Sequence, residues 1–292
     1  MNKVYKQLKK YFLIGAKELI YGGHLSAIED ASLIVIAISL TSLPLNIIPI
    51  AIIYLAAQVV YTYNHFSEIA ADSTSNPERT KYIKKDRTKK ILAIYIVLLL
   101  FFVALTNIAT ILLVLIITLA GISYTVFLKE VLTKRIIGFK NVYTTSLLTS
   151  SIFIVPTFYG VQFNSTLVYL FCIAFMRMFV NTSFCDIKDI VSDKQFGLKT
   201  LPVVFGKKRT IYILNLISFI SLIPLIFGVY NDSLPTEALF LGAAYFYRLY
   251  YLIKGSSVGE IELRRLAYIM VDSEYIFWLI VLVIGRGTLQ IL

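Results

Sequence analysis

The chain has few charged residues and almost no cysteine. Of its 292 residues, 15% are charged, 58% are hydrophobic and two are cysteine, and the mean hydropathy is +0.78. Cys172 and Cys185 are expected to lie roughly 20 Å apart on one helix, too far for a disulfide bond, and to serve as small core residues. A soluble domain of this size does not need so much apolar sequence, so the composition predicts a polytopic all-α membrane protein.

Basic residues are absent from every second connection between the apolar segments. Windows of about 20 apolar residues predict nine membrane spans, at residues 25–45, 47–68, 90–107, 109–128, 142–160, 165–185, 210–230, 236–253 and 271–290. Tight hairpins are expected near Asn107 and Asn164. Apart from Arg177 and Arg286, every Lys and Arg falls in residues 3–17, 79–90, 129–140, 188–209 or 248–265. The connections without Lys or Arg are residues 41–50, 105–109, 158–166 and 229–236.

This distribution of basic residues indicates topology. The positive-inside rule places the N-terminus in the cytoplasm and the basic loops on the cytoplasmic face of the cell membrane. The net charge of +11 is therefore explained without a nucleic-acid partner, and the sequence gives no sign of a protein partner.

The chain also has no linker and no low-complexity segment, so residues 1–292 are expected to form one domain around a central cavity. The first span is too long for a secretory signal and lacks a cleavage pattern. Residues 4–20 alternate lysines with apolar residues, as in a helix that lies on the membrane surface. Residues 25–128 and 142–253 are candidate halves of a parallel repeat, followed by a ninth helix.

Two acidic motifs follow the second and sixth predicted spans, and each precedes a basic loop. If each motif is helical, its oxygen-bearing side chains share one face. The residues are Asn64, Glu68 and Asp72 in the first motif, and Asp186, Asp189 and Asp193 in the second. Carboxylates cost about 2.5–3.5 kcal/mol each at the centre of a membrane helix, so such clusters are functional by default. Capping is a poor alternative, because negative charge at a helix C-terminus opposes the helix dipole.

The chemistry of these side chains indicates a divalent cation. Mg²⁺ prefers oxygen ligands and is usually bound by one or two carboxylates together with substrate phosphate. Two facing stripes beside basic loops therefore predict two or three Mg²⁺ ions around one diphosphate.

With these motifs the chain resembles the UbiA superfamily of intramembrane prenyltransferases. That family carries N-D-x-x-D-x-x-x-D after its second helix and D-x-x-D-x-x-x-D after its sixth. The second pattern matches in full, and residues 197–207 also resemble the family. The first pattern matches only at Asn64 and Asp72, because His65 replaces the first aspartate and Glu68 the second. The loss of one anion leaves the number and geometry of the metal ions open.

The resemblance also implies a set of basic and aromatic residues that bind the diphosphate. It places a tyrosine and a lysine at Tyr124 and Lys129, and an arginine at Arg79. Further candidates are Lys81, Lys134, Arg135 and Lys140. Arg suits phosphate oxygens as a bidentate fork and Lys as a point charge. Each of these residues is alternatively a topology charge with no contact to substrate.

Two further residues have a structural and a functional interpretation. Arg177 lies within a span and needs an acidic or carbonyl partner, for which Glu29 and Asp30 are candidates. His65 is expected to make a supporting hydrogen bond, with contact to metal or acceptor as the alternative.

The resemblance implies a Mg²⁺-dependent transfer of an isoprenyl group from an isoprenyl diphosphate to an aromatic or lipid-headgroup acceptor, through an allylic cation. Substitution of Asp72, Asp189 or Asp193 is expected to abolish turnover. A secondary transporter is the main alternative, since transporters also carry intramembrane acids and repeats. A phospholipid-forming phosphotransferase needs a D-G-x-x-A-R element, which the sequence lacks. A family member without catalytic activity is a further alternative, because His65 replaces an aspartate of the first motif.

Overall fold

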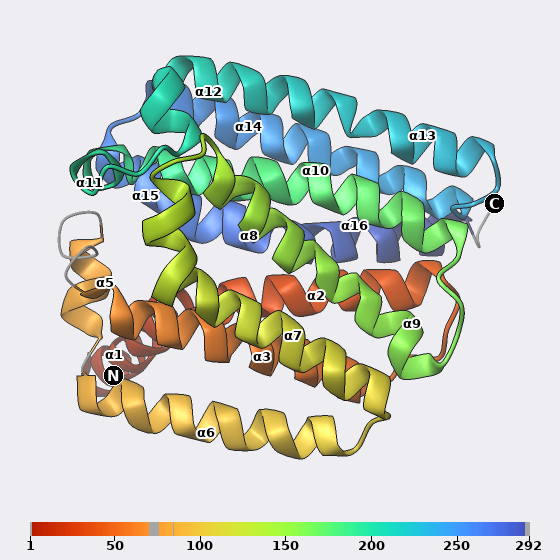
Figure 1. The fold of residues 1–292 in the computed structure, drawn as a ribbon, viewed down its shortest axis with the longest axis horizontal. Helices are drawn as coiled ribbons and strands as arrows, with labels where there is room; N and C mark the ends of the chain where they lie inside the picture. Colours follow the sequence, from red (N-terminus) through yellow and green to blue (C-terminus); the bar gives the residue numbers. More distant parts are fainter. Residues whose placement is uncertain (1, 70–75, 84, 290–292) are drawn as a thin grey trace.

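The computed structural model describes residues 2–69, 76–83 and 85–289, and in these residues the chain forms helices and no β-strand (Figure 1). The first half contains α1 (Asn2–Tyr21), α2 (His24–Leu40), α3 (Ile47–Ser67), α5 (Pro77–Tyr82), α6 (Lys85–Ala104), α7 (Ile108–Ser123) and the π-helical η1 (Tyr124–Thr133). The second half contains α8 (Phe139–Thr149), η2 (Ser150–Phe153), α9 (Ile154–Tyr159), α10 (Ser165–Ile187), α11 (Ile190–Gln195), α12 (Leu201–Ile220), α13 (Leu222–Tyr230), η3 (Thr236–Gly242), α14 (Ala243–Ser257), α15 (Glu260–Arg265), η4 (Leu266–Met270), η5 (Val271–Ser273) and α16 (Glu274–Leu289).

Some of the predicted spans meet the length and composition of a membrane helix in the described residues. Five helical segments do so, namely Ile47–Ser67, Ile108–Lys129, Ser165–Ile187, Leu201–Tyr230 and Glu260–Leu289. A sixth is the pair Lys9–Tyr21 and His24–Leu40, which is bent by 62°. The other predicted ranges are also helical, but α6 begins in the basic loop, α8 and α9 are separated by a 3₁₀ turn, and α14 is short. Nine crossings and the cytoplasmic N-terminus therefore stay predictions.

Asparagine caps mark where three of the long helices begin. The Asn46 side chain accepts a hydrogen bond from the Ile48 backbone N–H at 2.9 Å and so caps α3. Asn107 caps α7 in the same way at 2.9 Å, and Asn164 caps α10 at 3.1 Å. A side-chain acceptor at this position satisfies a backbone N–H that the helix leaves unpaired. The tight turns expected near Asn107 and Asn164 are therefore present.

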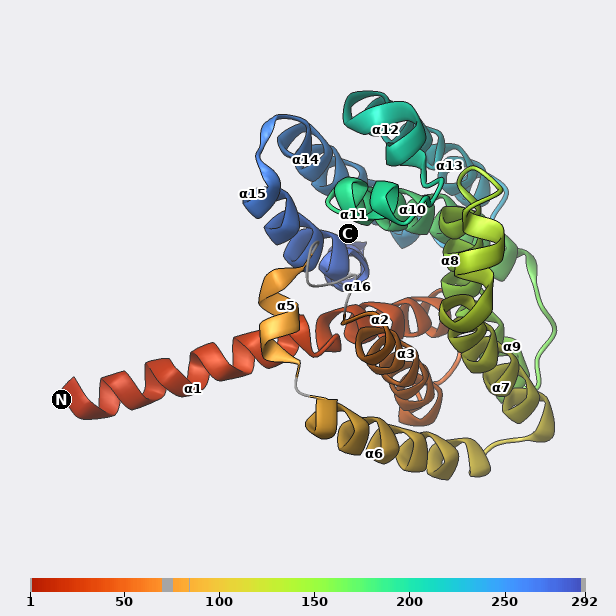
Figure 2. The same ribbon diagram turned by 60° about the vertical axis from the view of Figure 1, so that its left-hand side comes forward.

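The helices form a ring in which α2 and α3 face α10 (Figure 2). The main core joins buried residues of α2, α3, α10 and α16, among them Ile34, Ile52, Ile173 and Trp278. A second cluster joins α10, α12, α14 and α15 at the end where the acidic motifs lie. Gly255 allows close packing there, since a Cβ would lie 2.6 Å from the Phe184 ring. The two clusters hold α3 and α10 in fixed positions on opposite sides of the ring.

Outward faces of the ring are apolar, and one helix leaves the ring altogether. The membrane-length segment that begins with α7 has only 11% of its most apolar window buried, and residues such as Leu112 and Ile116 are exposed. Such faces are what lipid contact requires.

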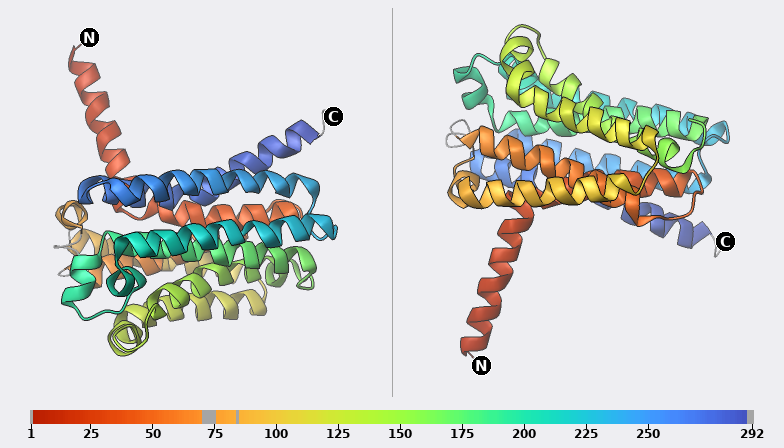
Figure 3. Two further views of the ribbon diagram at one scale, coloured as in Figure 1. Left: turned by 90° about the horizontal axis from the view of Figure 1, so that it is seen from above. Right: turned by 60° about the horizontal axis from the view of Figure 1, so that its bottom comes forward.

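Helix α1 projects away from the other helices (Figure 3). The Tyr11 and Phe12 side chains in its N-terminal part are exposed, whereas Glu18 near its C-terminus is ion-paired with Arg87 of α6.

Candidate functional site

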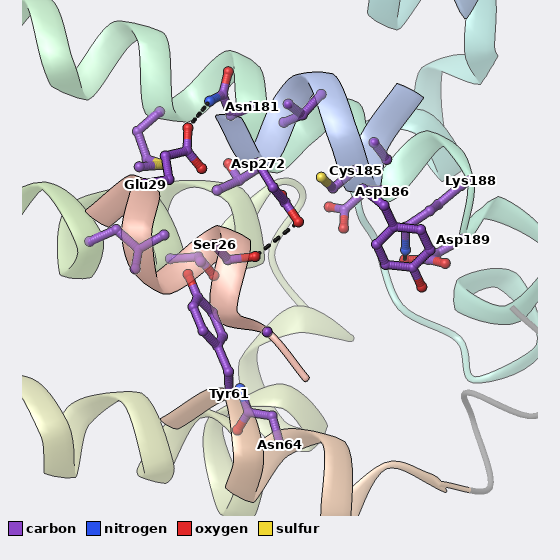
Figure 4. Close-up of a pocket in the computed structure, with 18 of the residues that line it drawn as sticks. Ser26, Glu29, Tyr61, Asn64, Asn181, Cys185, Asp186, Lys188, Asp189 and Asp272 are labelled. Carbon is purple, nitrogen blue, oxygen red and sulfur yellow. Dashed lines mark hydrogen bonds and ion pairs between the residues drawn. The ribbon is translucent and has the colours of Figure 1, made fainter. Parts of the chain in front are cut away.

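A cavity of about 260 Å³ opens at the end of the ring where α3 and α10 terminate. Both acidic motifs contribute to its wall, with Asn64 and Glu68 from the first and Asp186 and Asp189 from the second (Figure 4). Residues more than 100 positions apart in sequence therefore meet over one space.

The first motif lies at the C-terminus of α3, which ends at Ser67 with Glu68 as the capping residue. The Asn64 side-chain oxygen accepts a hydrogen bond from the Thr125 hydroxyl. Glu68 forms an ion pair with Lys129, with 2.6 Å between Lys129 Nζ and Glu68 Oε1. The third residue of the motif, Asp72, lies outside the described residues.

The second motif does not form the continuous helical stripe that its spacing predicts. Helix α10 ends at Ile187, and Asp189 has non-helical dihedral angles (φ −101°, ψ 5°) as the residue before α11. The break turns the chain, yet Asp186 and Asp193 approach the same ammonium group. Lys140 Nζ lies 2.5 Å from Asp186 Oδ1 and 4.0 Å from Asp193 Oδ2.

Hydrogen bonds fix the carboxylates of the second motif. Asn141 Nδ2 donates to Asp186 Oδ2 at 2.7 Å, and the Thr200 hydroxyl donates to Asp193 Oδ2 at 3.1 Å. Two backbone hydrogen bonds hold the segment at Lys199, which follows the second motif, against residues 133–138. The Lys199 N–H donates to the Thr133 carbonyl and the Gly138 N–H donates to the Lys199 carbonyl, each at 2.9 Å. The basic loop and the second motif therefore form one packed unit.

Burial and neighbouring charges act on these carboxylates in opposite directions. Burial raises the pKa of Asp193 to about 6, opposed by Lys140 and reinforced by Asp186 and Asp189. Burial also acts to raise the pKa of Asp189, but Lys188 and Lys140 outweigh it, so that this pKa lies below its ordinary value. Asp189 is therefore held as an anion at neutral pH.

The predicted diphosphate-binding residues are only partly assembled at the cavity. Arg79 and Lys140 line it. Lys129 contacts the wall through Glu68. Tyr124 is not a lining residue, and its hydroxyl lies 3.3 Å from Thr133 Oγ1. Three other candidates do not line the cavity. Lys81 is exposed on α5, and Lys134 and the exposed Arg135 lie in the loop after η1.

His65 and Arg177 have different surroundings. His65 lines the cavity, and its Nε2 lies 3.0 Å from Arg79 Nη1. Arg177 is fully buried away from the cavity, where it donates to the Leu241 carbonyl at 3.1 Å and stacks on the Trp278 ring at 4.3 Å. The expected ion pair with Glu29 or Asp30 is wrong for the described residues, because a carbonyl and an aromatic face supply the partners.

Sequence reasoning missed several residues of the cavity wall. Lys188 lies inside the second motif, forms an ion pair with Asp189 at 2.6 Å and lies over the Tyr268 ring. Asp272 comes from η5, far away in sequence. Glu29 and Asp30 line the cavity too, although the sequence suggested them only as partners of Arg177. An acidic residue within an apolar span was the available signal for these three acids.

The residues of the wall suit a divalent cation, although they do not form a closed metal site. Among the described residues, no three His, Cys, Asp or Glu side chains lie close enough together to hold a metal ion. The Asp189 Oδ1 atom is buried without a hydrogen-bond partner. Three carboxylates each contact a lysine ammonium, so a positive group already occupies the position expected for a metal cation. They are Glu68, Asp186 and Asp189. Carboxylates with an open coordination sphere are what Mg²⁺ shares with substrate phosphate.

One apolar pocket adjoins the cavity, and a second apolar pocket adjoins the first. The first lies between α3, α7 and α8, shares Asp30 and Tyr61 with the cavity, and includes Ala57 and Thr118. The second lies between α3, α6 and α7, again includes Thr118, and has a volume of about 200 Å³. A polar cavity that adjoins apolar pockets suits an amphiphilic ligand.

Comparison with known proteins agrees with this geometry. The model of the UbiA prenyltransferase family matches residues 31–270. No protein with a curated description matches the sequence. A UbiA homologue from Aeropyrum pernix K1 has a similar fold, with 15% identity, a TM-score of 0.65, and 86% of this chain and 97% of that chain covered.

Two more solved structures share the fold. A UbiA homologue from Archaeoglobus fulgidus bound to GPP and Mg²⁺ is 15% identical, with a TM-score of 0.63 and 91% of this chain and 98% of that chain covered. A digeranylgeranylglyceryl phosphate synthase structure is 17% identical, with a TM-score of 0.58 and 92% and 98% covered.

Proposed function

The chain belongs to the UbiA prenyltransferase family, and we propose that it transfers an isoprenyl group from an isoprenyl diphosphate to a nucleophilic acceptor inside the membrane. The observation that carries the proposal is the convergence of both acidic motifs and three basic side chains, Arg79, Lys140 and Lys188, on one cavity. A similar fold binds GPP and Mg²⁺ in the Archaeoglobus fulgidus homologue, which supports the same substrate class here.

The acidic residues of the two motifs would hold two or three Mg²⁺ ions together with the diphosphate. The proposed ligands are Asn64, Glu68, Asp72, Asp186, Asp189 and Asp193. When bound, Mg²⁺ neutralises the charge that develops on a departing diphosphate. Lys140, Lys188 and Arg79 add positive charge at the same end, and the lysine ammonium groups move from carboxylates to phosphate oxygens when the substrate enters.

The isoprenyl tail would extend from the cavity into the apolar pockets beside α3 and α7. Breaking the bond between C1 and the diphosphate oxygen leaves an allylic cation. The face of Tyr61, which lines both the cavity and the first apolar pocket, is placed to stabilise it. Capture by an aromatic ring or a lipid headgroup completes the transfer.

The basic loops place the cavity toward the cytoplasmic face of the cell membrane in this account. A secondary transporter, the alternative, places its acids at the membrane midplane in broken helices. Here Asp186 lies at the end of α10, next to the break, and α3 runs unbroken to Glu68. These positions favour an enzyme that opens to one side.

The experiment is a turnover assay in proteoliposomes with geranylgeranyl diphosphate, Mg²⁺ and a set of aromatic and lipid-headgroup acceptors, read as released diphosphate together with prenylated acceptor. We expect turnover in the wild type and loss of at least about 10²-fold in Asp189→Ala, because removing a group that stabilises transition-state charge costs about that much. Asp232→Asn, in the connection after α13, is the matched control and is expected to retain activity. Equal turnover in Asp189→Ala and wild type would contradict the proposal.

A further inference from the structure

The cavity has a second acidic surface, which the proposed donor site does not use. We call Glu29, Asp30 and Asp272 the inner acidic wall. These residues lie on α2 and η5, and all three line the cavity with Asp186 and Asp189. Figure 4 shows Glu29 and Asp272 beside Ser26 and Asn181, on the side of the cavity away from Lys188.

The inner acidic wall lies deeper in the bundle than the motifs. Its partners Tyr61 and Asn181 precede Asn64 and Asp186 on the same helices by three and five residues, which is roughly 5–8 Å at 1.5 Å per residue. Glu29 and Asp30 are 5% and 4% exposed. Since carboxylates are expensive this far from water, their presence requires a role.

A neutral side-chain donor orients each carboxylate. Asn181 Nδ2 donates to Glu29 Oε1 at 3.2 Å, the Tyr61 hydroxyl to Asp30 Oδ2 at 3.1 Å, and the Ser26 hydroxyl to Asp272 Oδ2 at 2.9 Å. Among the described residues, the structure shows no hydrogen bond to the Oδ1 atom of Asp30 or of Asp272, and neither atom is fully enclosed. Both residues line the cavity, so these oxygens can accept a hydrogen bond from a ligand.

Among the described residues, no lysine or arginine is ion-paired with this wall, and Lys188 and Arg79 act on Asp272 only from a distance. In the part of the chain that the structure describes, the three carboxylates also do not form a group that could hold a metal ion. Lys140 and Lys188 are paired instead with two carboxylates of the second motif. An organic ligand that donates hydrogen bonds suits the wall, whereas an anionic group placed there faces carboxyl oxygens and no ion-pairing lysine or arginine.

We propose that the inner acidic wall binds the acceptor, and that it selects an acceptor with uncharged hydroxyl groups or with an amino group over one with a carboxylate or phosphate. The inference rests on the proposed prenyl transfer and names its acceptor class. The acceptor oxygen or nitrogen forms a bond to C1 of the isoprenyl group as the bond to diphosphate breaks. The acceptor proton passes to a carboxylate of the wall, so that the products are the prenylated acceptor, diphosphate and one proton.

The test compares acceptors that share a scaffold and differ in the charge of one substituent. The purified protein receives geranylgeranyl diphosphate, Mg²⁺ and one of 4-hydroxybenzyl alcohol, tyramine or 4-hydroxybenzoate. A second pair is a 1-O-alkylglycerol and its phosphate. Products are quantified by mass spectrometry. We expect kcat/KM for the neutral and cationic members to exceed that of their anionic partners by at least tenfold.

Variants then connect the preference to the wall. Asp272→Asn and Glu29→Gln preserve shape and replace a carboxyl group by a neutral amide that can also donate to an anion, so we expect the ratio of neutral to anionic kcat/KM to fall at least threefold while Mg²⁺-dependent hydrolysis of the donor by water persists. Glu262→Gln, on α15 and outside the cavity wall, is the control and should leave the ratio unchanged. Retained hydrolysis also shows that the variants are folded.

The outcomes separate this inference from the proposed function. Preference for the anionic members, an unchanged ratio in both wall variants, or donor hydrolysis with no transfer to any acceptor would overturn the acceptor assignment alone. Absence of both hydrolysis and transfer in the wild type would overturn the proposed function itself.

Discussion

Replacing Lys140 by methionine tests the electrostatic design of the cavity. The Lys140 ammonium lies 2.5 Å from Asp186 Oδ1, and the Asp186 side chain is 3% exposed. Without Lys140, the Asp186 carboxylate retains only the hydrogen bond from Asn141. Breaking a buried ion pair costs about 3–5 kcal/mol, and the lower end applies here because the Lys140 side chain is 24% exposed.

The stability loss should depend on divalent cations. In EDTA we expect Lys140→Met to lower the free energy of unfolding by about 3 kcal/mol. The loss should be smaller in millimolar Mg²⁺, because a metal cation supplies the missing charge. We expect the Kd for the isoprenyl diphosphate to rise about 10- to 100-fold, because the variant loses one charge-assisted hydrogen bond from Lys140 to the diphosphate.

The assay is thermal and denaturant unfolding of the protein in detergent, followed by tryptophan fluorescence, with and without Mg²⁺. Lys194→Met removes an exposed lysine of α11 and serves as the matched control. Unchanged stability of Lys140→Met in EDTA would refute the reasoning, since Asp186 would then not depend on a nearby cation.

Three further predictions concern the tail, the metal and the core. Ala57→Phe fills the first apolar pocket and so leaves less room for a long isoprenyl tail. We expect kcat/KM for geranylgeranyl diphosphate to fall about tenfold more than for geranyl diphosphate, because each CH₂ of the tail that is no longer buried costs about 0.8 kcal/mol. EDTA should abolish turnover, and added Mg²⁺ should restore it, measured as diphosphate release. Glu274→Gln leaves the buried Arg248 guanidinium without its charge partner and should cost about 3–5 kcal/mol in denaturant unfolding, whereas Glu260→Gln, at the exposed start of α15, should cost little.

The sequence predicts best those features that depend on neighbouring residues. Apolar runs mark the helices, and Asn107 and Asn164 cap the helices that follow them. The second acidic motif and its basic neighbourhood are likewise local patterns, and both motifs line the cavity. The number of crossings is less well predicted, because basic residues enter α6 and α14 from the loops.

Contacts between distant segments are what the sequence does not reveal. The Ser26–Asp272 hydrogen bond joins residues 246 positions apart, so the sequence marks Asp272 as an acid in an apolar span without indicating that it meets α2 at the cavity. The break at Asp189 is similar, since the helical spacing of the motif gives no sign of the non-helical dihedral angles that Asp189 adopts between α10 and α11. The partners of Arg177 also come from distant segments. Its guanidinium donates to a carbonyl and lies over an aromatic ring, where the sequence suggested an acid.

The central claim is a metal-dependent diphosphate site between the two acidic motifs. The most direct measurement is binding of geranylgeranyl thiodiphosphate, a non-hydrolysable donor, to the purified protein by calorimetry with and without Mg²⁺. The account predicts binding that requires Mg²⁺ and disappears in Asp189→Ala. Absence of binding to folded wild-type protein in millimolar Mg²⁺, or equal binding in EDTA, would contradict it.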